Sequence, residues 1–238
     1  MRGASATPQG RFSDLRTRVP EDRMHLALML ALTFATGVVD AVGYLGLDRV
    51  FTGNMTGNVV ILGMALVGAE DLPVLGPVLA LAGFMAGAAL GGRVLRKAAG
   101  AWTARTTVLF ALVSLSVLGL GFALLVGGDD LSSGLQATTT AVLGAAMGTQ
   151  AATARFIAVK DVTTVVVTST ITGLAADSML GSGKGGGSAR RLLAIALILA
   201  GATAGALVLR WSLASGVLLA GAVIGVVTLV GWWHARPA

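Results

Sequence analysis

One polar stretch decides the fold of this chain: Phe51-Thr52-Gly53-Asn54-Met55-Thr56-Gly57-Asn58. It repeats Thr-Gly-Asn twice, between an apolar run that ends near Leu47 and another that ends near Val67. Glycine and asparagine are poor helix formers, and an asparagine amide needs a hydrogen-bond partner once it leaves water. Inside a membrane, non-helical backbone is tolerated only where it is buried in protein or lines a wet cavity. We therefore interpret the rest of the chain as a scaffold that holds this 51–58 segment.

The composition around the segment is that of an integral membrane protein. Of the 238 residues, 55% are hydrophobic and only 12% are charged, and the mean hydropathy is +0.85. Soluble domains carry roughly one quarter charged residues. The net charge of +6 does not indicate a nucleic-acid partner, because the basic residues lie between apolar runs and not along a face with interleaved aromatics. We expect a disordered cytoplasmic tail over residues 1–22 and one polytopic membrane domain over 23–236.

The charges between the apolar runs predict the topology. If every run crossed the membrane, the basic loop 93–105 would face outward and Glu70 and Asp71 inward, against the positive-inside rule. If the runs that follow Phe51 and Asp161 each enter and return on one side, most of the 17 Lys and Arg residues face the cytoplasm. We therefore predict an all-α membrane protein with six transmembrane helices, two short re-entrant helices and both termini in the cytoplasm. The eight apolar runs are 24–47, 55–67, 72–92, 106–125, 135–159, 162–180, 192–209 and 212–233.

The same topology predicts an internal repeat. The 52–58 sequence aligns with 164–170 at an offset of 112 residues, and both copies read Thr, three residues, Thr, then a small and a polar residue. With three crossings in each half, the halves 24–127 and 131–234 would form an inverted 3+3 repeat, which is a recurrent plan of secondary transporters. A chance match between Thr- and Gly-rich sequences is the alternative. Glycines four residues apart could bring helices together within the chain or in a homodimer.

Asp40 is the acidic residue that lies well inside an apolar run. A carboxylate at the centre of a membrane helix costs at least about 2.5 kcal/mol, so it is a functional hypothesis by default. Asp40 could bind a cation, relay a proton or pair with a base, although the predicted depth of Arg155 is wrong for a pair. The alternative is that Asp40 is protonated, or that it caps the broken segment through backbone amides.

The remaining candidates lie in the two copies of the repeat. At the start of a short helix, polar groups and free N–H groups favour an anion or a carboxylate, whereas opposed carbonyl ends would suit a cation. The alternative is that these side chains only satisfy a turn, or that threonine hydroxyls bond back to helix carbonyls. The predicted substrate-binding residues are Asp40, Thr52, Asn54, Thr56, Gly57, Asn58, Gln150, Thr164 and Thr168.

The sequence does not contain the residue patterns that nucleophilic or metal-assisted catalysis needs. Cysteine is absent, His25 and His234 lie at opposite ends of the chain, and no acidic pair has the spacing of metal ligands. We therefore expect no catalytic residue, no metal and no cofactor, and we do not expect an enzyme.

Several motifs together resemble a known family. Gly-Val-Val-Asp-Ala-Val-Gly-Tyr at 37–44, the 51–58 segment, Gly-Thr-Gln at 148–150 with Arg155, and the threonine-rich 163–173 stretch resemble the YoaK-like bacterial membrane proteins, a family defined by a domain of unknown function. The resemblance covers about residues 24–233. It implies a six-span protein of the bacterial cytoplasmic membrane, and it implies no substrate. Ser169 stands where a glycine would match the first copy of the repeat, which weakens the case for two equivalent sites.

The sequence thus favours a secondary transporter or permease for a small polar or ionic solute. Its partners would be the lipid bilayer, an unknown small solute and a second copy of the chain, with no nucleic acid. The alternative function is a membrane scaffold or sensor that transports nothing. A wet cavity that reaches Asn58 would favour transport, and dry packing around Asp40 and Asn58 would favour the scaffold.

Overall fold

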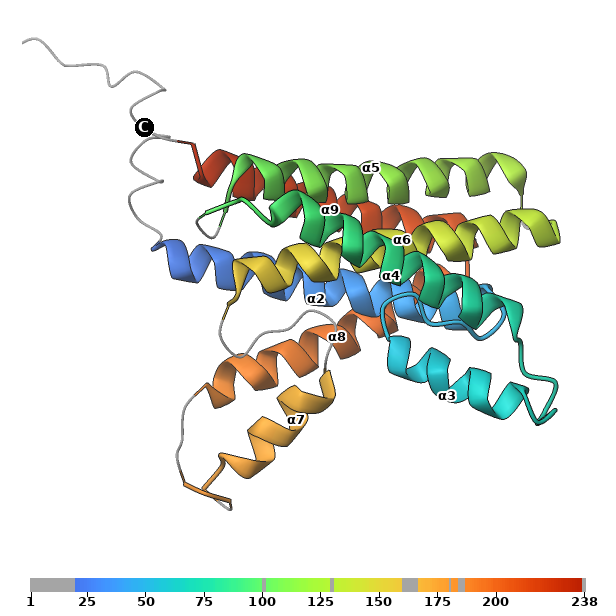
Figure 1. The fold of residues 1–238 in the computed structure, drawn as a ribbon, viewed down its shortest axis with the longest axis horizontal. Helices are drawn as coiled ribbons and strands as arrows, with labels where there is room; N and C mark the ends of the chain where they lie inside the picture. The colour runs from blue at the N-terminus through green and yellow to red at the C-terminus, as the bar shows by residue number, and fades with distance from the viewer. Residues whose placement is uncertain are drawn as a thin grey trace, which may run out of the picture.

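The computed structural model describes residues 20–99, 102–128, 131–159, 167–179, 181–183 and 187–236, and these form eight α-helices (Figure 1). Each helix coincides with a predicted apolar run, with ends that differ by a few residues. The predicted 1–22 tail lies outside the described residues except for its last three, and α2 begins at Glu21. Asp161 and Thr164 also lie outside them. The helices are α2 Glu21–Gly46, α3 Met55–Ala65, α4 Leu75–Leu95, α5 Ala104–Gly127, α6 Ser133–Ile157, α7 Val167–Ala176, α8 Ser188–Val208 and α9 Leu213–His234.

Five of these helices are long and apolar enough to cross a membrane: α2, α4, α5, α8 and α9. Two shorter apolar helices, α3 and α7, have 11 and 10 residues. The sixth long helix, α6, has 25 residues but carries more threonine and glutamine than the others. The protein is therefore a multi-pass integral membrane protein, and α6 is the most polar of its long helices.

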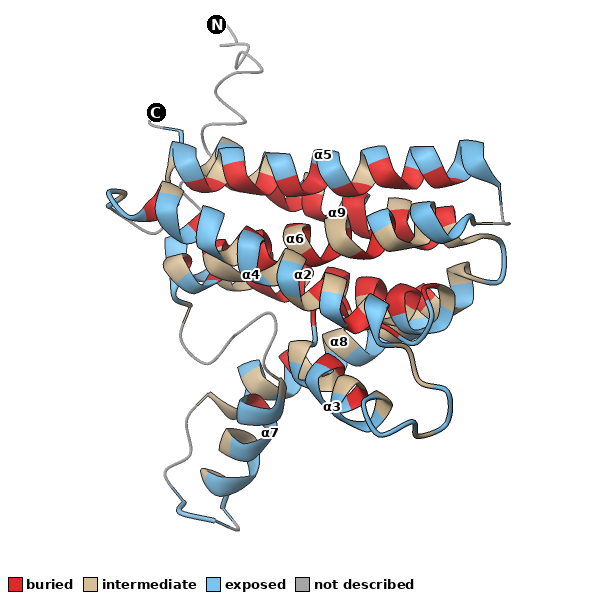
Figure 2. Cartoon of the chain, turned by 45° about the vertical axis from the view of Figure 1, so that its right-hand side comes forward, coloured by how far each residue is buried: buried red, intermediate tan, exposed pale blue. Residues whose placement is uncertain are grey.

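The long helices pack in pairs around one core. Helix α4 lies along α6, α2 lies along α8 and α9, and α5 lies along α9 and α6. Each short helix packs on the long helix that follows it, α3 on α4 and α7 on α8. Buried residues face inward between the long helices, whereas α3 and α7 have few buried residues (Figure 2). Exchanging α2 with α6, α3 with α7, α4 with α8 and α5 with α9 leaves this set of pairings unchanged, with the α5–α9 pair mapped onto itself.

Glycines set close helix contacts in the same way in two helix pairs, α4–α6 and α2–α8, each of which joins the first half of the chain to the second. A Cβ atom on Gly148 of α6 would overlap the carbonyl oxygen of Phe84 on α4, and one on Gly87 of α4 would overlap that of Ala145 on α6. Helices α2 and α8 repeat the arrangement, with Gly37 against Ile198 and Gly201 against Phe34. The glycines four residues apart therefore pack helices of one chain against each other.

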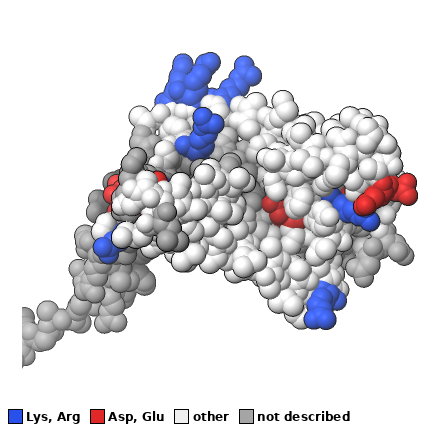
Figure 3. Space-filling model, turned by 90° about the horizontal axis from the view of Figure 1, so that it is seen from below, with Lys and Arg blue, Asp and Glu red and all other residues white. Residues whose placement is uncertain are grey.

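The ends of the bundle differ in charge. The first turn of α2, the last turn of α9 and the connection from α4 to α5 lie at one end, where Glu21, Trp102 and His234 line one pocket. That connection carries Arg93, Arg96, Lys97 and Arg105, and Arg105 donates to the carbonyl of Val94 at 3.1 Å. Figure 3 shows Lys and Arg side chains mostly over the left half of one face, and a broad uncharged surface around some recessed acidic atoms. The bundle therefore has a basic end next to an apolar middle.

Candidate functional site

The 51–58 segment turns back along the helix that precedes it. Helix α2 ends at Gly46, and two residues with left-handed backbone, Asp48 (φ 62°) and Arg49 (φ 57°), reverse the chain. Thr52 and Gly53 then lie beside Asp40, about 9 Å from the end of α2 at 1.5 Å per residue. Helix α3 runs back toward the end of the bundle where α4 begins (Figure 1). The segment therefore enters the bundle and returns on the side from which it came.

Asp40 holds this segment through one of its two oxygens. The Oδ1 atom accepts hydrogen bonds from the backbone N–H groups of Thr52 (3.1 Å), Gly53 (2.7 Å) and Asn54 (3.2 Å). The Oδ2 atom has no hydrogen-bond partner within the described ranges, and the side chain is partly exposed. Asp40 therefore caps the broken segment, which was one of the alternatives that the sequence left open. The cap leaves the Oδ2 atom of Asp40 unused.

Asn58 closes the segment from the other side. Its Oδ1 atom accepts from the backbone N–H of Phe51 at 2.9 Å, and its Nδ2 atom donates to the carbonyl of Phe51. The side chain is buried, with 1% of its surface exposed. Asn54 caps α3 by accepting from the N–H of Gly57 at 3.3 Å. Gly57 is required there because a Cβ atom would lie 2.6 Å from the ring of Phe51.

We expect Asn58→Ala to lower the free energy of unfolding by about 2 to 4 kcal/mol, because it leaves a backbone N–H and a carbonyl of Phe51 without partners. Asn54→Ala is the matched control, since it removes an exposed cap that is worth about 1 kcal/mol. Denaturant or thermal unfolding of the purified protein in detergent would measure both. Equal losses in the two variants would contradict the role assigned to Asn58.

Gln150 reaches the site from the second half of the chain. Its Nε2 atom donates to Oγ1 of Thr36 at 3.1 Å, one turn before Asp40 on α2. Gln150 is fully buried, and its Oε1 atom has no hydrogen-bond partner in the part of the chain that the structure describes. The methyl group of Thr36 also faces Gly53, where an added Cβ atom would lie 2.9 Å away. Thr36 therefore links Gln150 to the segment that Asp40 holds.

The other predicted residues do not bond to the group around Asp40. Thr56 and Thr168 are exposed on α3 and α7, and the carbonyl of Thr168 accepts from the hydroxyl of Thr172 at 2.9 Å. Thr164 lies outside the described residues. The structure thus gathers Asp40, Thr52, Asn54, Gly57 and Asn58, adds Gln150 through Thr36, and leaves Thr56 and Thr168 apart. Sequence reasoning missed Thr36, although its position four residues before Asp40 puts both on one helix face.

Thr170 on α7 matches Asn58 in burial. It is 7% exposed and is the buried residue of its helix, as Asn58 and Ile61 are in α3. The offset of 112 residues that aligns the two copies pairs Thr170 with Asn58. The polar position that faces inward is therefore the same in both short helices.

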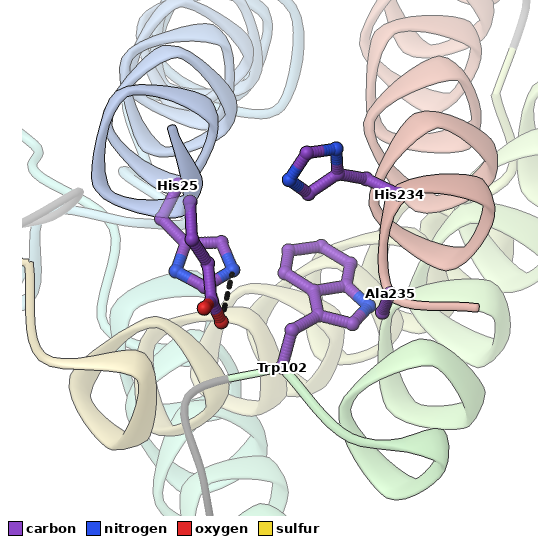
Figure 4. Close-up of a pocket in the computed structure, with 5 residues that line it drawn as sticks. His25, Trp102, His234 and Ala235 are labelled. Atoms are coloured by element: carbon purple, nitrogen blue, oxygen red, sulfur yellow. Dashed lines mark ion pairs between the residues drawn. The ribbon is translucent and has the colours of Figure 1, made fainter. Parts of the chain in front are cut away.

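A second polar cluster lies at the basic end of the bundle. His25, Trp102 and His234 line a pocket of about 230 Å³ together with Glu21 and Ala235 (Figure 4). The rings of His25 and Trp102 are stacked with centroids 6.0 Å apart, and His25 Nε2 lies 3.9 Å from Glu21. The fold therefore joins two histidines that the sequence places at opposite ends. Within the described ranges, no group of three or more His, Cys, Asp and Glu residues is placed to hold a metal ion.

Comparisons with known proteins agree with the membrane architecture. The family model described as "Protein of unknown function (DUF1275)" matches residues 28–230. The UPF0700 transmembrane protein YoaK of Bacillus subtilis (strain 168) is 38% identical over 86 residues, which is 36% of this chain and 38% of that protein. The match thus spans well under half of the relative. No solved structure matches this chain.

Proposed function

The chain belongs to the DUF1275 family of proteins of unknown function, and with that premise and the geometry of the site we propose that it is a secondary transporter or permease for a small polar or ionic solute. We further propose that it spans the bacterial cytoplasmic membrane six times, with two short re-entrant helices and both termini in the cytoplasm. The proposal includes no enzymatic activity.

Three features of the fold support this topology. The short helices α3 and α7 each pack on the long helix that follows, and the 51–58 segment returns to the side from which it entered. Exchange of the two halves preserves the helix pairings, and equivalent glycines make equivalent contacts. Inverted repeats with discontinuous helices that meet at the site are a common transporter plan. The basic end of the bundle would face the cytoplasm.

The functional proposal rests on the two oxygens of Asp40, of which only one is hydrogen-bonded. It lies inside a 26-residue apolar helix, uses one oxygen to hold a non-helical segment and keeps the other oxygen unpaired and partly exposed. The cap engages only Oδ1, so the second oxygen remains available to a solute. Ionisable groups in membrane helices mark solute paths and proton relays.

We expect Asp40→Asn and Asn58→Ala to reduce the transported flux at least about tenfold, because charge at the site or closure of the 51–58 segment is lost. Proteoliposomes with the purified protein would be incubated with a mixture of metabolites and ions, and uptake measured by mass spectrometry. Asp48→Asn is the matched control, since Asp48 is exposed and asparagine tolerates its positive φ. Unchanged fluxes in both site variants would contradict the site assignment.

One observation favours the alternative of a scaffold or sensor that transports nothing. Thr52 and Asn58 are buried, with 0% and 1% of their surfaces exposed, and their polar groups bond to the protein's own backbone. Packing of this kind could serve only to lock the fold. An absence of uptake across the whole mixture, from well-folded and correctly inserted protein, would favour this alternative.

A further inference from the structure

We propose that the site formed by α2, α6 and the loop 51–54 binds a small monovalent cation through the free oxygens of Asp40 and Gln150. This inference rests on the proposed function and deepens it, because it gives the charge of the transported solute or of a coupling ion. It also decides between the anion and the cation that the sequence left open.

The donors nearest to Asp40 are already occupied, whereas the N–H groups of Met55 and Thr56 have no acceptor among the described residues. A helix start binds anions through its free N–H groups. Here the N–H groups of Thr52, Gly53 and Asn54 all donate to Asp40 Oδ1. The N–H of Gly57 donates to Asn54, and the N–H of Phe51 donates to Asn58. An anion at this helix start would lie close to the negatively charged carboxylate of Asp40, which disfavours its binding.

The unused polar atoms of the cluster are acceptors. Asp40 Oδ2 and Gln150 Oε1 both have no donor within the described residues. Thr36 bonds to Gln150, and its methyl group and the Asp40 carboxylate both face Gly53, but its hydroxyl cannot satisfy either oxygen because it donates to the carbonyl of Leu32 at 2.9 Å. Gln150 Oε1 is buried, and a buried acceptor without a donor is unfavourable. A ligand that supplies positive charge or N–H donors would satisfy both oxygens.

The negative charge of Asp40 also favours a cation. Among the described residues, the ion pairs join His25 to Glu21 and Arg191 to Asp177, and neither pair includes Asp40. Asp40 therefore brings one negative charge without a basic partner into the apolar middle of α2. One carboxylate matches one positive charge, whereas Ca²⁺ and Mg²⁺ need more oxygen ligands and more negative charge. Sodium, potassium and ammonium share the required chemistry.

Thermal unfolding of the purified full-length protein in detergent would test this site. Sodium, potassium or ammonium chloride would replace choline chloride at constant ionic strength and fixed pH. We expect at least one of these cations to raise the Tm by about 5 °C at one hundred times its Kd. Asp40→Asn should abolish the shift, because asparagine keeps an oxygen for the three N–H groups but has no charge. Gln150→Leu should reduce the cation affinity at least about fivefold.

Matched variants make the result specific. Asp48→Asn repeats the loss of charge at an exposed position, and Gln136→Leu repeats the change of Gln150 near the other end of α6. Both should keep the full cation-dependent shift. The proposal is overturned if no cation raises the Tm, if Asp40→Asn keeps the shift, or if Gln150→Leu binds like the unmodified protein. A pH dependence without any cation effect would assign Asp40 to proton binding and would also overturn it.

The thermal-shift measurement and the flux measurement test the cation site and transport separately. A cation-dependent shift without any flux would leave the cation site standing and reject transport. Flux without a cation-dependent shift would reject the cation site and leave transport standing.

Discussion

Asp40→Ala is expected to lower the free energy of unfolding by about 3 to 6 kcal/mol, because three backbone N–H groups lose their acceptor at once and each loss costs about 1 to 3 kcal/mol. The hydrogen bonds in question join Asp40 Oδ1 to residues 52, 53 and 54 at 2.7 to 3.2 Å. The loss should be largest in this segment, which has no helical hydrogen bonds of its own. Unfolding of the purified protein in detergent would measure it.

The comparison with Asp40→Asn separates the cap from the charge. Asparagine keeps an oxygen acceptor in nearly the same place, so its loss of stability should be less than half of that of alanine. Asp48→Ala should change little, because Asp48 is exposed. An accessible cysteine at position 54 should react with a maleimide faster in the Asp40→Ala background than in the parent. A parent-like rate and unchanged stability would show that Asp40 does not hold the segment.

Gly148→Ala and Gly201→Ala are each expected to lower the free energy of unfolding by about 3 kcal/mol, at the upper end of the usual cost of overpacking. The added methyl group would overlap a backbone carbonyl of the facing helix, Phe84 for Gly148 and Phe34 for Gly201. A backbone atom cannot move aside as the end of a flexible side chain can, so the helices must separate. The same unfolding assay would measure both variants.

Gly92→Ala on α4 is the matched control, because no atom lies within 4 Å of its added Cβ. It should be neutral or stabilising by about 0.5 to 1 kcal/mol, since alanine favours helix over glycine. Losses of similar size at Gly148 and Gly201 are expected because each added methyl group would overlap a backbone carbonyl oxygen of the facing helix. An unchanged free energy of unfolding in both variants would contradict the close helix contacts.

The sequence predicted the parts of the fold that depend on local chemistry. Long apolar stretches form helices whatever their neighbours are, so α2, α4, α5, α8 and α9 follow from composition and length. Gly53 and Asn54 predicted the break between α2 and α3 because both residue types are poor helix formers, whereas Gly57 and Asn58, which were expected to extend the break, lie in the first turns of α3. Glycines four residues apart predicted close helix packing, since they share one face.

The partner of each polar side chain could not be predicted in the same way. Thr56 and Asn58 are both polar and only two residues apart, yet Thr56 is exposed and Asn58 bonds to Phe51. The 100° rotation per residue and the return of the loop decide which of them faces inward. His25 and His234 line one pocket only because the first turn of α2 packs beside the last turn of α9.

By itself the sequence determined a multi-pass helical membrane protein with a polar break after α2 and a carboxylate inside that helix, because hydropathy and helix propensity are properties of short stretches. Only the tertiary structure decided that one oxygen of Asp40 bonds to the segment and that Gln150 reaches Thr36 from the other half. It also decided that one acceptor on Asp40 and one on Gln150 have no donor among the described residues. Hydrogen bonds join groups that are neighbours in space, and the packing of the two halves makes these residues neighbours.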